Sequence, residues 1–128
     1  MCVTLSVLIV DDSRSFLDAA RDLLAGQGVR VVGLTSSSAE ALRQSAKLHP
    51  EVMLIDITLA GESGFDLARR LAEQREGAAV MISISTYPQA DFADLVDESP
   101  AAGFLPKSEL TAGAIRRIAG GMPGAHVR

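Results

Sequence analysis

Short runs of hydrophobic residues alternate five times along the chain with longer stretches that mix hydrophobic and polar positions. The short runs are rich in β-branched and aliphatic residues, which is typical of strands buried on both faces of a parallel sheet. We therefore predict strands at 5–10, 29–34, 52–56, 79–84 and 102–105. Strands that alternate with amphipathic helices predict a doubly wound α/β domain with the order (βα)5.

The stretches between these strands carry hydrophobic residues at helical spacing. In the first stretch they predict one apolar helix face, formed by Phe16, Ala19, Ala20, Leu23 and Leu24. Ser37 and Glu40 have capping-box spacing and predict the start of a second helix, which ends before Pro50. Ser63 is the predicted cap of the third helix, and the fourth and fifth are expected at 89–98 and 109–119.

Polar residues stand at the ends of four predicted strands: Asp11 and Asp12, Asp56, Ser85 and Thr86, and Lys107. In an open parallel sheet, binding sites lie beyond the carboxyl ends of the strands. Three carboxylates at that edge would repel one another by roughly 1 to 4 kcal/mol per pair at ~4 Å, and Mg²⁺ would offset this repulsion because it prefers oxygen ligands. A carboxylate surrounded by Mg²⁺, an ammonium group and a hydroxyl is suited to accept a phosphoryl group as a nucleophile.

Composition narrows the class of protein further. The chain has 128 residues and a formal net charge of −4, which fits one domain whose core needs no disulfide or structural metal. An acidic chain with one tyrosine and no tryptophan argues against direct nucleic-acid contact. The hydrophobic run 3–10 is too short to cross a bilayer, and the single cysteine, Cys2, cannot form an internal disulfide, so we expect a cytoplasmic protein without a membrane anchor. His49 and His126 lack partners at metal-ligand spacing.

These strand ends resemble the receiver domains of two-component response regulators, over residues 5–119. Residues 7–13 (VLIVDDS) are similar to the family's first strand and acidic pair, and residues 54–59 (LIDITL) to its phosphoacceptor strand. Gly64 follows at the family's usual position, and residues 103–107 (GFLPK) resemble its lysine motif. The resemblance implies a flavodoxin-like fold with the strand order 2-1-3-4-5.

The resemblance implies a role for each polar residue at the strand ends. Asp56 would accept a phosphoryl group from a histidine kinase or a histidine phosphotransfer protein. Asp12, Asp56 and the backbone carbonyl of Thr58 would hold Mg²⁺, with Asp11 acting through water. Lys107 would bind a phosphoryl oxygen. In this interpretation the chain catalyses its own phosphorylation and dephosphorylation and is not an enzyme for an external substrate.

A switch is also implied by the resemblance. Ser85 would donate its hydroxyl to a phosphoryl oxygen, and the space that this movement opens would admit Phe104. The change would repack the face formed by the predicted helix 89–98, strand 102–105 and helix 109–119. That face is expected to bind an output domain, an effector protein or a second copy of the chain.

The lifetime of the phosphoryl group depends in this family on the residues two beyond the phosphoacceptor and two beyond the switch hydroxyl, here Thr58 and Tyr87. Thr58 is too short to orient the attacking water and Tyr87 is bulky enough to shield the phosphorus, so both favour slow self-hydrolysis. Three positions depart from the family pattern: Ala60 and Ser108 stand where proline is common, and Ser37-Ser38 replaces a frequent glycine after the second strand. None of these departures removes a group that binds Mg²⁺ or phosphate.

Three other classes of protein share features with this chain. Haloacid-dehalogenase-like phosphatases also use a strand-end aspartate, but they need a second aspartate two residues later, where this chain has Thr58. Flavodoxin-like FMN proteins need a phosphate-binding turn rich in hydroxyl groups and glycine after the first strand. This chain has residues 11–14 (DDSR) there, and the acidic pair would repel a phosphate. The main alternative is a pseudo-receiver, a protein-binding module that is not controlled by phosphorylation. The presence of Asp12, Asp56 and Lys107, together with Ser85, argues against it.

One receiver domain is expected at residues 1–119, followed by a flexible tail at 120–128. Residues after 119 are too few for an effector domain, so the chain is interpreted as a stand-alone receiver or as the regulatory part of a longer protein. Residues 104–110 resemble receivers attached to helix-turn-helix DNA-binding domains, which favours a role in transcription regulation.

Overall fold

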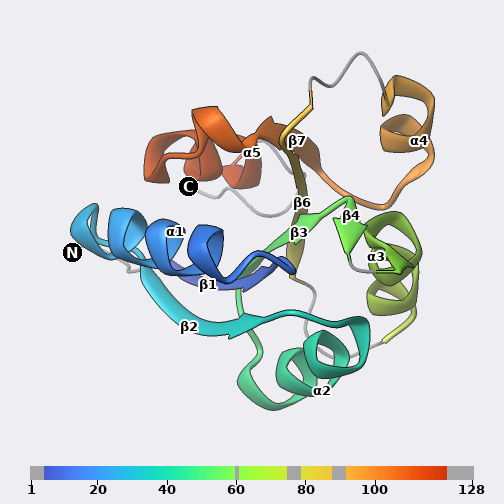
Figure 1. The fold of residues 1–128 in the computed structure, drawn as a ribbon, viewed down its shortest axis with the longest axis horizontal. Helices are drawn as coiled ribbons and strands as arrows, with labels where there is room; N and C mark the ends of the chain where they lie inside the picture. Colours follow the sequence, from blue (N-terminus) through green and yellow to red (C-terminus); the bar gives the residue numbers. More distant parts are fainter. Residues whose placement is uncertain (1–4, 60, 75–78, 88–91, 121–128) are drawn as a thin grey trace.

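A five-stranded parallel sheet forms the centre of the computed structural model, which describes residues 5–59, 61–74, 79–87 and 92–120 (Figure 1). All five predicted strands are present: β1 (Ser6–Val10), β2 (Arg30–Thr35), β3 (Val52–Asp56), β6 (Val80–Ser85) and β7 (Gly103–Pro106). Their order across the sheet is β2-β1-β3-β6-β7. This order confirms the predicted 2-1-3-4-5 topology of a doubly wound α/β domain.

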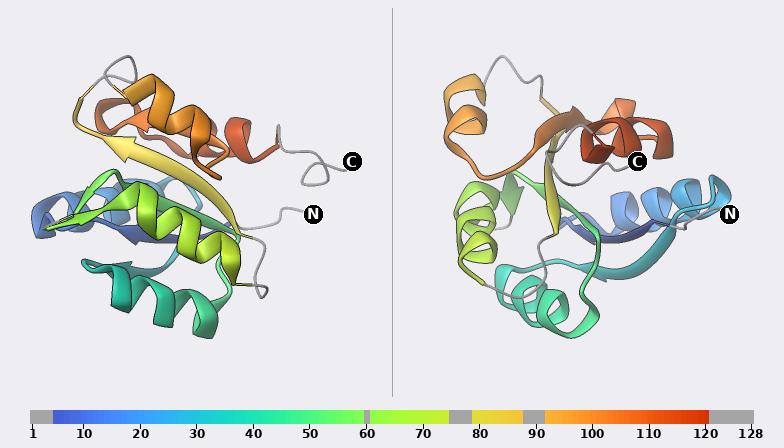
Figure 2. Two further views of the ribbon diagram at one scale, coloured as in Figure 1. Left: turned by 90° about the vertical axis from the view of Figure 1, so that its right-hand side faces the viewer. Right: turned by 180° about the vertical axis from the view of Figure 1, so that it is seen from behind.

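Helices cover both faces of the sheet (Figure 2). Helices α1 (Arg14–Gly26) and α5 (Ala112–Gly120) pack on one face, where alternate strand residues such as Val7 and Ile9 meet Leu17, Leu24 and Ile115. Helices α2 (Ser38–Leu48) and α3 (Gly64–Glu73) pack on the other face, against residues such as Leu8 and Met53. Strands buried on both faces explain the continuous hydrophobic runs in the sequence.

A third, smaller hydrophobic cluster lies beside these two cores. It joins Ile57 and Phe65 to Val96 of α4 (Ala93–Glu98) and Phe104 of β7, with Phe92 packed against it. Because α4 contributes one buried residue, its attachment to the domain depends on few side chains. The predicted start of this helix at residue 89 lies outside the described residues.

Serine caps begin three of the helices at the same end of the sheet. Ser13 Oγ accepts a hydrogen bond from Phe16 N, Ser37 Oγ accepts one from Glu40 N, and Ser63 Oγ accepts bonds from Phe65 N and Asp66 N. Glu40 also accepts a bond from Ser36 N, the residue before the cap, rather than from Ser37 N as in the predicted capping box. These caps fix the connections that follow β1, β2 and β3.

Two helix predictions need correction. The buried face of α1 consists of Leu17, Ala20 and Leu24, whereas Ala19 and Leu23 are exposed. The predicted set was rotated because Leu17 was not counted among the apolar positions. Helix α5 begins at Ala112 rather than at 109, since a 3₁₀ turn (Lys107–Glu109) follows β7 and Thr111 Oγ1 then accepts a bond from Ala114 N.

A short antiparallel hairpin, absent from the prediction, connects β3 to α3. It consists of β4 (Thr58–Leu59) and β5 (Glu62–Ser63), and Gly61 adopts a positive φ of 71° at its turn. Cys2, Ala60, His126 and residues 121–128 of the predicted tail 120–128 lie outside the described residues. No described helix is long and apolar enough to cross a membrane.

Candidate functional site

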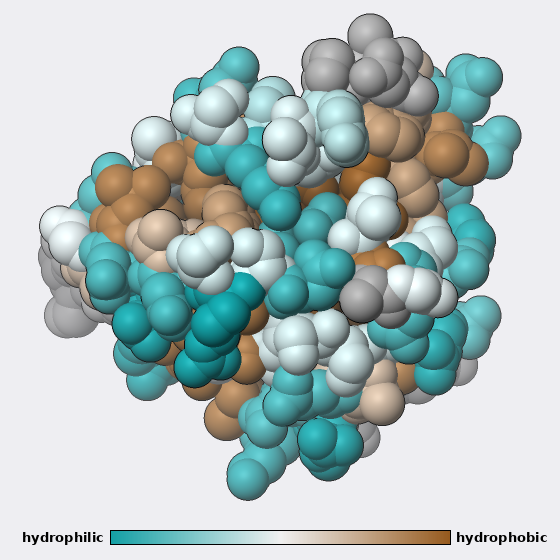
Figure 3. Space-filling view, in the orientation of Figure 1, coloured by the Kyte–Doolittle hydropathy of each residue, from teal (hydrophilic) through white to brown (hydrophobic). Residues whose placement is uncertain are grey.

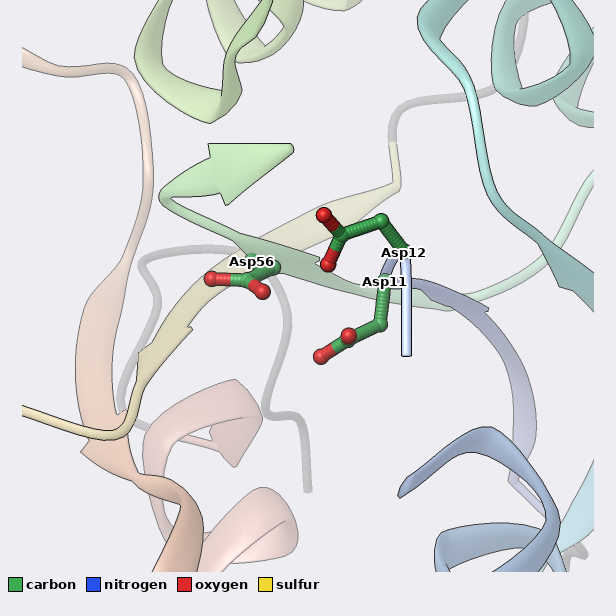
Figure 4. Close-up of side chains that lie close together, drawn as sticks. All are labelled: Asp11, Asp12 and Asp56. Carbon is green, nitrogen blue, oxygen red and sulfur yellow. The ribbon is translucent and has the colours of Figure 1, made fainter. Parts of the chain in front are cut away.

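Three carboxylates meet at the carboxyl end of the sheet, as the sequence predicts (Figure 4). Asp11 and Asp12 follow β1, and Asp56 ends the neighbouring strand β3, with which β1 pairs in parallel. Each residue offers a carboxylate oxygen, and these oxygens lie within 4.8 Å of one another. Asp11 and Asp56 are buried, whereas Asp12 is exposed, so the cluster opens toward solvent on the side of Asp12.

Lys107 reaches this cluster from the end of β7, on the far side of β6. Its Nζ atom lies 2.6 Å from Asp11 Oδ2 and 3.2 Å from Asp56 Oδ2. Burial alone lowers the pKa of Lys107, but the hydrogen bond to Asp11 and the charges of Asp56 and Asp11 outweigh it and raise the pKa above its ordinary value. The ammonium group therefore stays charged and holds the two buried carboxylates together.

Asp56 is held in a defined orientation by hydrogen bonds to both of its oxygens. Thr58 N donates to Oδ1 at 3.1 Å, and Lys107 Nζ donates to Oδ2 at 3.2 Å. Burial raises the pKa of Asp56 from 3.8 to about 6, because the bond from Thr58 N and the charge of Lys107 offset only part of the cost of burial and of the nearby Asp11 charge. Above that pH the carboxylate is ionised and can act as a nucleophile.

Asp11 is fully buried and anchors the loop after β1. Its Oδ1 accepts a hydrogen bond from Ser13 N at 2.8 Å, and its backbone N donates to Thr35 O at 3.0 Å. Its Oδ2 is buried, and the contact that compensates its charge in the described structure is the ion pair with Lys107. Sequence spacing alone could not show that the first aspartate is buried while Asp12 faces solvent.

The predicted switch residues lie on the two neighbouring strands β6 and β7. Ser85 is buried, and its Oγ accepts a hydrogen bond from Tyr87 N at 3.0 Å. Phe104 is 8% exposed and belongs to the third hydrophobic cluster with Val96. Phe104 pairs with Ser83 inside β6, and Ser85 pairs with Pro106, so Lys107 follows β7 directly beyond the end of β6.

The loop after β3 approaches Asp56 so closely that it requires glycine. A Cβ atom on Gly64 would lie 1.9 Å from the backbone oxygen of Asp56, and Gly64 N donates to Ile57 O at 2.9 Å. Glu62 Oε1 also accepts a bond from Ser38 N at the start of α2, which ties the hairpin to the neighbouring helix. These contacts, which the sequence analysis did not identify, fix the backbone around Thr58.

Two further residues border the site. The exposed side chain of Tyr87 lies beyond Ser85, with its ring centroid 6.5 Å from that of Phe92. Phe16, in the first turn of α1, lies beneath Lys107, with 4.5 Å between Nζ and the ring centroid. The sequence pattern predicts Phe16 only as part of the apolar face of α1, and its spacing four residues after Asp12 gives no separate signal of this contact.

The charge of the cluster fits a divalent cation. Three carboxylates face one ammonium group, so the described side chains leave an excess of two negative charges at neutral pH. All the candidate ligands are hard oxygen donors, and one side of the cluster is open, which suits an ion that keeps several of its waters. Asp12, Asp56 and a backbone carbonyl of the hairpin are therefore chemically suited to hold Mg²⁺.

Comparison with solved structures places this fold among signal receiver domains. The receiver domain of the putative response regulator NarL from Mycobacterium tuberculosis is 25% identical and superposes with a TM-score of 0.81, covering 94% of this chain and 100% of that chain. A LuxR-family two-component response regulator from Aurantimonas sp. SI85-9A1 is 26% identical, with a TM-score of 0.80 over 92% of this chain and 87% of that chain. The family model of the response regulator receiver domain matches residues 7–118, and the chain belongs to this family.

Curated relatives share the same region of sequence but differ in what accompanies it. A protein-glutamate methylesterase/protein-glutamine glutaminase of Idiomarina loihiensis is 31% identical over 106 residues, which are 82% of this chain and 28% of that protein. The response regulator GacA of Pseudomonas viridiflava is 27% identical over 113 residues, 88% of this chain and 52% of that protein. The chain thus spans between about a quarter and a half of the length of these relatives.

Proposed function

We propose that this chain is a phosphoacceptor domain in which Asp56 takes a phosphoryl group from a histidine kinase or a histidine phosphotransfer protein. The observation that carries this proposal is the cluster of Asp11, Asp12 and Asp56 with Lys107 bound between its two buried members. A structural salt bridge would need one carboxylate for one lysine. Three carboxylates at the open edge of the sheet instead suit a reaction in which a divalent cation and a phosphoryl group enter the site.

In the proposed reaction, an oxygen of Asp56 forms a bond to phosphorus while the bond from phosphorus to the donor's imidazole nitrogen breaks. The hydrogen bond from Thr58 N holds the carboxylate plane, so that Oδ2 is the oxygen beside Lys107. Lys107 would then offset the charge on a phosphoryl oxygen, and Ser85 would donate its hydroxyl to another. Bound Mg²⁺ would supply further charge compensation and would orient the phosphoryl oxygens.

The Mg²⁺ ligands in this proposal are Asp12, Asp56 and the backbone carbonyl of Thr58, with Asp11 acting through water. Support for Asp12 comes from its exposure beside the two buried carboxylates. Support for Thr58 comes from the hairpin contacts that fix its backbone. Both carboxylate oxygens of Asp11 already have partners, since Oδ1 accepts from Ser13 N and Oδ2 pairs with Lys107. This favours contact with Mg²⁺ through water rather than direct coordination.

Phosphorylation would act on a protein-binding face through Ser85 and Phe104. Movement of the Ser85 hydroxyl toward the phosphoryl group would break its bond with Tyr87 N and open a space for Phe104, and the third hydrophobic cluster, to which Phe104 belongs, would repack. The face formed by α4, β7 and α5 would then bind an output domain, an effector protein or a second copy. The cytoplasm is the proposed compartment. The similarity to a putative transcriptional regulator of Pseudomonas aeruginosa, 32% identical over 103 residues, favours transcription regulation as an output.

Mg²⁺-dependent labelling of Asp56 tests the proposal. The purified chain, incubated with MgCl₂ and a small phosphodonor such as acetyl phosphate, should gain one acid-stable, base-labile phosphoryl group. Asp56→Asn should gain none, and a control variant at an exposed aspartate of α1, Asp22→Asn, should label as the parent does. Absence of labelling in the parent would favour the pseudo-receiver alternative, and labelling of Asp56→Asn would place the acceptor elsewhere.

A slow loss of the phosphoryl group is part of the proposal. Tyr87 is 60% exposed beside the site and can shield it from water, and Thr58 has no long polar arm with which to orient a water molecule. Tyr87→Ala and Thr58→Gln should each shorten the lifetime by about twofold or more. The decay of labelled protein after removal of the donor measures this. A longer lifetime in Tyr87→Ala would show that the tyrosine helps to place the water.

A further inference from the structure

The ammonium group of Lys107 has an aromatic neighbour as well as two carboxylates. Its Nζ atom lies 4.5 Å from the ring centroid of Phe16, over the face of the ring, within the distance at which cations are attracted by an aromatic quadrupole. Because the lysine side chain is 17% exposed, water screens this attraction only in part. The ring of Phe16 therefore covers one side of the Lys107 ammonium group.

Phe16 is itself held by the same loop that carries the acidic pair. Ser13 Oγ accepts a hydrogen bond from Phe16 N, and Ser13 N donates to Asp11 Oδ1. The ring is partly buried against the core between the sheet and the helices α1 and α5. Its place is thus fixed from one side by the helix cap and from the other by hydrophobic packing.

We propose that Phe16 is a positioning residue for Lys107 during phosphoryl transfer, an inference that rests on the proposed function. A carboxylate partner fixes the ammonium group in one direction, but the face of a ring attracts it over a broad area and offers no hydrogen-bond acceptor that would compete with a phosphoryl oxygen. The lysine could therefore move from Asp56 toward a phosphoryl group while it stays on the ring. The ring also excludes water from one side of the ammonium group, which strengthens its electrostatic effect.

Phosphorylation rates of matched variants test this role. Phe16→Leu and Phe16→Met keep an apolar side chain but remove the ring, whereas Phe16→Tyr keeps the ring. At saturating Mg²⁺ and acetyl phosphate, the first two should react roughly three- to tenfold more slowly, and Phe16→Tyr should stay within about twofold of the parent. The affinity for Mg²⁺ should be unchanged in all three, and thermal unfolding shows that each variant is folded. Equal rates for the leucine and tyrosine variants would overturn the proposal.

Dependence on the lysine separates positioning from packing. In a Lys107→Met background, the further change Phe16→Leu should slow the residual phosphorylation by less than about twofold, because the ring no longer has a cation to hold. A loss as large as in the parent background would show that Phe16 acts through packing alone. Such a result would contradict the proposal even if all variants are stable.

A spectroscopic measurement does not depend on phosphorylation and distinguishes the two proposals. The side-chain protons of Lys107 beside Nζ should resonate upfield in the parent and in Phe16→Tyr because of the ring current, and should move toward ordinary values in Phe16→Leu. If the parent cannot be phosphorylated but this pattern is found, the proposed function fails and the placement of Lys107 by Phe16 stands. If the resonances do not respond to Phe16→Leu, the positioning role is refuted whatever the labelling shows.

Discussion

Asp56→Asn is expected to stabilise the metal-free protein, because hydrogen bonds and the charge of Lys107 offset only part of the cost of burying the Asp56 carboxylate. The pKa of Asp56 rises from 3.8 to about 6, mainly through burial. At about 1.36 kcal/mol per pH unit, this rise corresponds to about 3 kcal/mol by which the ionised group destabilises the native state at neutral pH. Water at the rim of the site reduces the cost, so we expect a gain of about 2 kcal/mol.

The pH dependence follows from the direction of the shift. Between about pH 4 and pH 6 the native state holds a proton on Asp56 that the unfolded state has released, so the parent loses stability as the pH rises through this interval. Asp56→Asn has no such group. The difference between the two proteins should therefore be small at pH 4, should grow up to about pH 6 and should be constant above pH 7.

Thermal and urea unfolding in buffers with EDTA, between pH 4 and pH 8, measure this difference. A gain of about 2 kcal/mol would appear as a rise of about 6–10 °C in the unfolding temperature of a domain of this size. Asp22→Asn is the matched control, since the Asp22 side chain is 77% exposed and should change stability by less than about 0.5 kcal/mol. Equal or lower stability of Asp56→Asn at pH 7.5 would refute the argument that burial of charge dominates at this site. Addition of MgCl₂ should stabilise the parent more than Asp56→Asn, because the ion binds the native carboxylates.

Three further predictions concern the ligand, the loop and the coupling to the rest of the domain. Asp12→Asn should weaken Mg²⁺ binding by about tenfold or more because a hard anionic ligand is lost, and an unchanged calorimetric titration would exclude Asp12 as a ligand. Gly64→Ala should cost about 2 kcal/mol or more in urea unfolding, since its Cβ would meet the carbonyl of Asp56 at 1.9 Å. Gly26→Ala, where a Cβ meets nothing within 4 Å, is the control and should change stability by less than about 1 kcal/mol. Lys107→Ala should still be phosphorylated slowly, but phosphorylation should not repack the face formed by α4, β7 and α5. Amide exchange on that face should therefore respond to phosphorylation less than in the parent. An equal response would refute the coupling role.

The elements that the sequence predicts best are those set by local hydrophobic runs and caps. The five strands and the caps at Ser37 and Ser63 agree with the structure because each depends on a few neighbouring residues. The strand order follows from the family resemblance rather than from any local pattern. The apolar face of α1 was misplaced because Ala19 and Leu23 fit the helical period as well as Leu17 does, and only packing against the sheet distinguishes them.

Sequence reasoning predicts some contacts between distant segments but not their detail. The positions of Asp11, Asp56 and Lys107 at strand ends predicted their meeting, since parallel strands end at one edge of a sheet. The spacing of residues along the chain does not determine side-chain directions. It therefore could not show which carboxylate is buried, or that Phe16 lies over the ammonium group of Lys107. The bond from Ser38 N to Glu62 likewise joins segments whose distance is set by the whole fold.

Strand β7 is one connection between the charged cluster and the third hydrophobic cluster. Ser85 pairs with Pro106, Lys107 follows directly, and Phe104 lies two residues earlier on the same strand. The cluster that holds Phe104 joins a few side chains and is separate from the two larger cores, so its repacking leaves most of the buried surface of the domain intact. Regions with few buried contacts open at low free-energy cost. In the proposed switch, a small movement of Ser85 or Lys107 would therefore change the surface near α4 without unfolding the sheet that positions the aspartates.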